Sequence, residues 1–147
     1  MKSILATNSG NWAALFARLA IAIAIFPHGA QKLLGWFGGG GFSGTMGFFT
    51  HTVGLPWIIG FLVIMIEFFA PLLLVLGLLT RLAAFAIGVN FIGVLFSSIL
   101  PNGFFMNWSM QGGKGEGIEY FVLLFGLVIV SLIAGGGKAS IDGALVE

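Results

Sequence analysis

The chain contains no cysteine and only two histidines, His28 and His51. Without cysteine it can form no disulfide, no thiolate metal site and no cysteine-ligated iron–sulfur cluster. Two histidines also offer little for binding a metal ion or a haem, so we expect neither as a cofactor. Any redox role would therefore depend on an organic cofactor, or on the redox centre of a partner protein.

Charged residues are scarce as well, at 7% of the 147 residues, against about 25% in soluble domains. Apolar residues make up 59% of the chain, and the mean hydropathy is +1.11. A core of this size could not enclose so much apolar surface, so we expect lipid to be the solvent. The net charge is only +1 and no basic run is present, which excludes a nucleic-acid-binding protein.

Four apolar segments are each compatible with crossing a membrane, which needs roughly 17–25 residues in a helix. None of them alternates between polar and apolar residues as the strands of a membrane barrel do. We therefore predict a single all-α domain over residues 1–147, an integral membrane four-helix bundle with up-down-up-down topology. The expected helices span residues 12–34, 57–79, 82–100 and 118–134.

The connections between these helices differ in length. Only residues 80 and 81 join the second helix to the third, so these two should form a tight hairpin. Residues 35–56 and 101–117 are two long loops, rich in glycine and phenylalanine, that leave the bundle on the same side. Because aromatic side chains suit the membrane interface, we expect the two loops to cover the mouth of the bundle together.

The orientation in the membrane is predicted from the basic residues in the connections and near the ends of the expected spans. The side of the termini carries three of them and the side of the long loops two: Lys2, Arg81 and Lys138 against Lys32 and Lys114. This difference favours cytoplasmic termini.

Polar residues inside three of the helices are predicted to form one layer in the membrane. Counting about 1.5 Å per residue from the expected helix ends places Arg18, Glu67 and Asn90 at similar depths. We expect Arg18 and Glu67 to form an ion pair, because a buried charge needs a partner. The layer would either belong to a functional site or fix the register of the helices.

A second polar cluster is expected near the ends of the helices that carry the long loops. His28, Gln31 and Lys32 share one helix face, because they follow one another at spacings of three and four. Other polar residues reach the same level from the third and fourth helices: Asn102, Glu119 and Tyr120. We expect these side chains to line a ligand-binding pocket in which Glu119 pairs with Lys32 or His28. The alternative is ordinary anchoring at the membrane interface.

The chain resembles the DoxX family of small bacterial membrane proteins with four helices. The resemblance rests on RLA at 18–20, PHGAQKLLGWFGG at 27–39, Glu67, GLLTRLAA at 77–84, LPNGFF at 100–105, and Glu119 with Tyr120. A departure is GKGEGIEY at 113–120, which leaves the shape of that loop open. The shared polar positions are Arg18, His28, Gln31, Lys32, Glu67, Asn102 and Glu119, and the resemblance implies no catalytic role for any of them.

The resemblance implies a protein of the bacterial inner membrane that serves a redox system. Members include the small subunit of a thiosulfate:quinone oxidoreductase and a component of a complex tied to thiol and superoxide defence. Three functions remain open. The protein could be a redox-associated subunit that binds a quinone between its helices, a homo-oligomeric binder or transporter of a small amphipathic molecule, or a scaffold for a partner protein.

Overall fold

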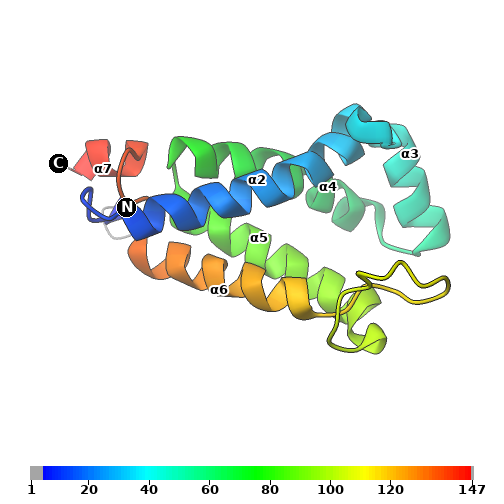
Figure 1. Cartoon of the computed structure of the whole chain (residues 1–147). Helices are drawn as coiled ribbons and strands as arrows, with labels where there is room; N and C mark the ends of the chain where they lie inside the picture. Colours follow the sequence, from blue (N-terminus) through cyan, green and yellow to red (C-terminus); the bar gives the residue numbers. More distant parts are fainter. Residues whose placement is uncertain (1–4, 147) are drawn as a thin grey trace.

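The computed structural model describes residues 5–146, and every regular element within this range is helical (Figure 1). Three segments are long and apolar enough to cross a membrane: α2 (Trp12–Leu34), α4 (Trp57–Leu76) and Thr80–Asn102. The third consists of α5 (Thr80–Val94), a π-helical turn, η3 (Leu95–Ile99), and a 3-10 turn, η4 (Leu100–Asn102). A shorter apolar helix, α6 (Glu119–Ala134), follows. The described part of the chain is thus an all-helical protein of membrane type.

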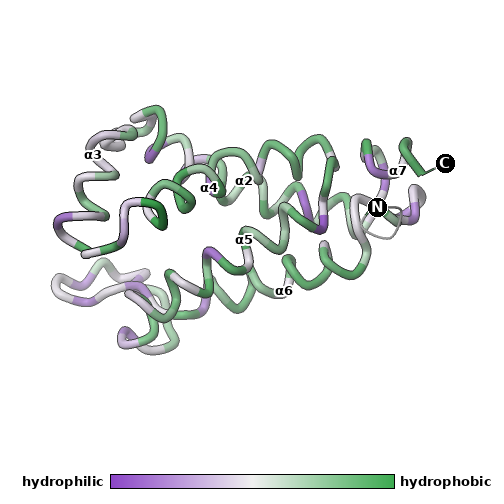
Figure 2. Tube along the Cα trace, turned by 180° about the vertical axis from the view of Figure 1, so that it is seen from behind, coloured by the Kyte–Doolittle hydropathy of each residue, from purple (hydrophilic) through white to green (hydrophobic). Residues whose placement is uncertain are grey.

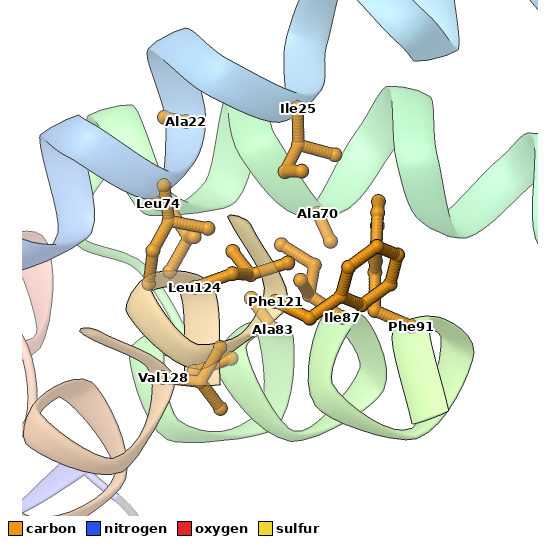
Figure 3. Packing of buried hydrophobic residues seen from close by; sticks show 12 residues of the cluster. Ala22, Ile25, Ala70, Leu74, Ala83, Ile87, Phe91, Phe121, Leu124 and Val128 are labelled. Atoms are coloured by element: carbon orange, nitrogen blue, oxygen red, sulfur yellow. The ribbon is translucent and has the colours of Figure 1, made fainter. Parts of the chain in front are cut away.

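The helices α2, α4, α5 and α6 lie side by side, with α2 and α5 each packing against both α4 and α6 (Figure 1). Their shared core is built from aliphatic, aromatic and small side chains, among them Ile25, Leu74, Ile87 and Phe121 (Figure 3). Apolar residues also predominate along the whole trace of these helices (Figure 2). Outward side chains such as Phe85, at 57% exposure, are apolar too, which suits a surface covered by lipid.

The hairpin between α4 and α5 turns earlier than the sequence predicted. The backbone leaves the helical conformation at Gly77 (φ 62°) and Leu79 (φ 50°), so α4 ends at Leu76 and the turn occupies residues 77–79. Glycine at the C-terminus of a helix readily adopts this left-handed conformation. Thr80 and Arg81, which we expected to form the turn, instead begin α5.

The long connection after α2 is largely helical rather than an extended loop. It contains η1 (Trp36–Gly38), α3 (Gly41–Gly47) and a π-helical turn, η2 (Phe48–Thr52). The connection before α6 carries no long helix, and its two ends are joined by backbone hydrogen bonds from Ile118 N to Gly103 O (3.0 Å) and from Glu119 N to Phe104 O (2.9 Å). Both connections lie at the same end of the molecule (Figure 1).

The C-terminal segment folds back onto the opposite end of the bundle, where the short helix α7 (Ile141–Val146) lies beside residues 5–11 (Figure 1). The carboxylate of Asp142 is 1% exposed and accepts hydrogen bonds from the backbone N–H groups of Leu79 (2.7 Å) and Thr80 (2.9 Å). Because the first N–H groups of a helix lack partners within it, Asp142 caps α5.

Candidate functional site

A cavity of about 770 Å³ lies at the end of the bundle that carries the two long connections. One wall is a face of α4, on which Ile59, Val63 and Ile66 follow one another at helical spacing. The connections close this end with further apolar side chains: Phe48, Phe49, Val53, Leu55 and Met106. Small-molecule sites commonly have volumes of about 300–1,000 Å³ and mostly apolar walls. The cavity therefore has the size and lining of a ligand site.

An ion pair and an amide form the polar floor of this cavity. The ammonium of Lys32, on α2, lies 2.5 Å from Oε2 of Glu67, on α4. The other carboxylate oxygen of Glu67 accepts a hydrogen bond from Nδ2 of Asn90, on α5, at 3.1 Å. Glu67 is almost fully buried, whereas the side chain of Lys32 is 25% exposed. Three helices thus place a compensated charge pair at the base of an apolar cavity.

A close approach of two backbones sets the position of this ion pair. A Cβ atom at Gly29 of α2 would lie only 2.2 Å from the backbone oxygen of Glu67, so only glycine fits there. That oxygen has no donor within α4, because the residue four positions later is Pro71. Glycine at a contact between membrane helices allows their axes to come close. Lys32 lies one turn further along α2 than Gly29 and therefore faces Glu67.

Two further titratable side chains line the cavity without hydrogen bonds to other described residues. The imidazole of His28 is exposed to the cavity and bonds to no group within residues 5–146. The hydroxyl of Tyr120, which starts the inward face of α6, is buried and also has no partner in that range. Polar groups of this kind are usually paired when buried. Both side chains carry groups that can donate a hydrogen bond to a ligand in the cavity.

The predicted partnership of Glu119 with Lys32 or His28 is wrong. The carboxylate of Glu119 accepts a hydrogen bond from the backbone N–H of Met106 at 3.1 Å, and so holds the connection before α6 in place. Its position at the start of α6 brings it next to the connection that precedes this helix. Lys32, for its part, is already paired with Glu67.

Gln31 and Asn102 also have roles outside the cavity. Nε2 of Gln31 lies 3.5 Å from the backbone oxygen of Phe37, within the turn that follows α2. Nδ2 of Asn102 donates to the backbone oxygen of Glu116 at 3.0 Å, which ties the start of the second long connection to its end. Of the predicted ligand-binding residues, the cavity contains His28, Lys32 and Tyr120.

The predicted ion pair between Arg18 and Glu67 is likewise wrong. The five N–H groups of the Arg18 guanidinium are all directed at backbone oxygens, and its nearest contacts are with α4 and the C-terminal segment. The acceptors are Leu74, Val75, Gly136, Lys138 and Ala139. Leu74 lies seven residues beyond Glu67 on α4, about 10 Å along the helix. The three residues of the predicted layer therefore do not lie together. Asn90 donates a hydrogen bond to Glu67, whereas Arg18 lies at the other end of the bundle.

The depth estimate failed because the ends of α2 and α4 are not level. Glu67 lies beside Gly29, which is five residues from the end of α2, whereas Glu67 itself is ten residues from the start of α4. The helices are therefore offset by about five residues, or roughly 7 Å. Gly29 was the one signal in the sequence that could have revealed this register, since a glycine inside an apolar helix marks a close helix contact.

Among residues 5–146, no three His, Asp or Glu side chains are grouped as metal ligands would be. Comparison with curated proteins and with solved structures finds no match. A sequence model of the family DoxX matches residues 13–98, which include nearly all of α2, all of α4 and most of the third apolar segment. Since this match covers more than half of the chain, the protein belongs to the DoxX family.

Proposed function

We propose that this protein is a redox-associated subunit of the bacterial inner membrane that binds a quinone, or a similar small amphipathic ligand, in the cavity between its helices. In this proposal α2, α4, the segment Thr80–Asn102 and α6 all cross the membrane in up-down-up-down order, with cytoplasmic termini. The single observation that carries the proposal is the apolar cavity with the Lys32–Glu67–Asn90 floor.

The residues around the floor fit the head group of a quinone. The ammonium of Lys32 has three donors and uses one on Glu67, so two remain for the oxygen of a ligand. His28 can donate to the same head group from the same helix, because its imidazole is otherwise unbonded within the described residues. Phe91 and Phe121, whose rings lie next to each other in the core (Figure 3), also line the cavity and can pack against an apolar ring.

A bound quinone would supply the ability to take up two electrons and two protons, with the electrons delivered by a redox partner protein. This chain would contribute binding, orientation and proton storage. Lys32 holds a proton at Nζ next to the carboxylate of Glu67, and Tyr120 holds one at its hydroxyl. The apolar walls would keep water away from the head group, which strengthens each of these polar contacts.

The experiment compares the two histidines of the chain. His28 lines the cavity, whereas His51 lies on η2 and is not among the cavity residues. Quinone binding to the purified protein in nanodiscs should weaken about fivefold in His28→Ala, which is the loss of one hydrogen bond of about 1 kcal/mol. His51→Ala should bind as the wild type does, and both variants should fold in equal yield.

Extraction of the purified protein followed by mass spectrometry identifies what it carries from the cell. A co-purifying quinone supports the proposal. A non-redox amphipathic molecule would replace it with a binding or transport function, and a stably bound protein with no small ligand would favour a scaffold. Equal quinone binding by wild type and His28→Ala would contradict the assignment of the head group to this cavity.

A further inference from the structure

The cavity reaches the outer edge of the α4–α5 hairpin. Leu62 on α4 and Val89 and Gly93 on α5 line the cavity and are themselves exposed, Leu62 at 45% and Val89 at 52%. On α4, the side chain of Leu62 points away from α2, which packs against α4 at Glu67. The cavity is therefore open sideways between α4 and α5, at a level where both helices are surrounded by lipid.

A shallow apolar groove continues from this opening along the outside of the hairpin. It has a volume of about 230 Å³, and its lining contains no charged side chain. Met65, Phe69 and Leu73 form its α4 side, and Leu82 and Ala86 form its α5 side. Ile66 lines both the cavity and the groove, so the groove begins next to the cavity. From Ile66 to Leu73 the groove extends about 10 Å along α4.

The end of the cavity at the two long connections is also exposed, with Phe48 at 53% and Val53 at 43%, but polar side chains gather there, among them Ser97 and Ser98. There the two long connections contribute Phe48, Phe49 and Met106 to the wall, together with the carboxylate of Glu116. The cavity itself, at about 770 Å³, has room for a ring and a substituent of moderate length, and a longer hydrocarbon chain would continue beyond it. For a tail that leaves the cavity, the side between α4 and α5 is the exit whose exposed lining residues, Leu62, Val89 and Gly93, are all apolar.

We infer that the ligand of this cavity is a lipid with a linear hydrocarbon tail, which enters sideways from the bilayer between α4 and α5 and lays its tail in the groove next to Ile66. The inference rests on the proposed ligand site but not on the identity of the head group. Since lipid and groove are equally apolar, the tail gains from close packing rather than from leaving water. The protein would then recognise the polar head group of the lipid at the cavity floor and the shape of its tail in the groove.

Gly93 provides the test, because it lies on the α5 side of the opening. A Cβ atom built on Gly93 meets nothing within 4 Å, so a larger side chain fits the fold and narrows the passage. Gly126 on α6 is a matched control: it is also an exposed glycine inside an apolar helix with nothing within 4 Å, and it does not line the cavity. Gly93→Leu and Gly126→Leu add the same atoms in these two places.

The probes are decylubiquinone and the corresponding quinone without a side chain, titrated into wild type and both variants in nanodiscs. Gly93→Leu should bind decylubiquinone at least tenfold more weakly than the wild type and the tail-less quinone unchanged, while Gly126→Leu should match the wild type for both. If Gly93→Leu weakened the binding of both quinones equally, or of neither, the lateral path would be wrong and the quinone proposal would stay intact.

Lipids extracted from the same three proteins separate the inference from the proposed function. A tailed lipid without a quinone head, enriched over the surrounding bilayer in wild type and Gly126→Leu but not in Gly93→Leu, would support the lateral path and refute the quinone. If neither quinone binds the wild type and no tailed lipid is enriched, both the proposal and the inference are wrong.

Discussion

Replacing Lys32 and replacing Glu67, the two partners of the ion pair at the cavity floor, should lower the free energy of unfolding by different amounts. Lys32→Met leaves the carboxylate of Glu67, whose side chain is 3% exposed, with Asn90 as its remaining donor. Loss of one partner of a buried pair costs about 3–5 kcal/mol, and we expect that full cost here. Glu67→Gln instead leaves an ammonium that is 25% exposed to the cavity and can turn into it. We expect this variant to lose only about 1–3 kcal/mol.

The assay is a double-mutant cycle on unfolding free energies, measured by titrating the protein in mixed micelles with a denaturing detergent and following helix content. The double variant Lys32→Met with Glu67→Gln should recover at least about 2 kcal/mol of the summed single losses, because neither side then carries an unpaired charge. Single effects that add to within about 0.5 kcal/mol, or a larger loss for Glu67→Gln than for Lys32→Met, would refute the assignment of Glu67 as the deeply buried partner.

Three further predictions follow from the geometry. Gly29→Ala should destabilise the protein by about 1–3 kcal/mol, because its Cβ would collide with the α4 backbone, whereas Gly126→Ala should have no such cost; equal melting temperatures would contradict the close helix contact. Tyr120→Phe should leave the unfolding free energy of the ligand-free protein unchanged or raise it by about 1 kcal/mol, since the lost hydroxyl has no partner among the described residues. In intact cells, an impermeant maleimide should label Ser43→Cys on α3 but reach Ala144→Cys on α7 only after permeabilisation; the reverse pattern would invert the topology.

The sequence predicted the positions of the helices better than the pairing of the polar side chains on them. A long uninterrupted run of apolar residues identifies a membrane helix directly, because a helix that crosses the lipid core needs about 20 mostly apolar residues. The presence of Lys32 and His28 at a common site was also readable, since both lie on one face of one helix. The pairing of Lys32 with Glu67 was not, because counting from helix ends assumes that the ends are level, and the contact at Gly29 shifts them.

Two other features left almost no trace in the sequence. Arg18 is satisfied by backbone oxygens, and every residue in the chain supplies one, so no partner residue could be singled out. Asp142 lies in the C-terminal segment, and its capping role depends on a hairpin turn more than sixty positions earlier, as its bond to Thr80 shows. Hydrogen bonds between a side chain and the backbone of a residue far away in the sequence cannot be predicted without the three-dimensional structure.

The arrangement around Arg18 has a consequence for how the protein is made. Its Nε donates to Gly136 O, a residue 118 positions later in the chain. At a synthesis rate of about 5–20 residues per second, the first helix would wait roughly 6–24 s before that acceptor exists. During this interval the guanidinium has to stay near water at the membrane surface, because an unpaired charge in the hydrocarbon region is costly. Residues 136–139 therefore allow α2 to settle at its final depth once they have been synthesised.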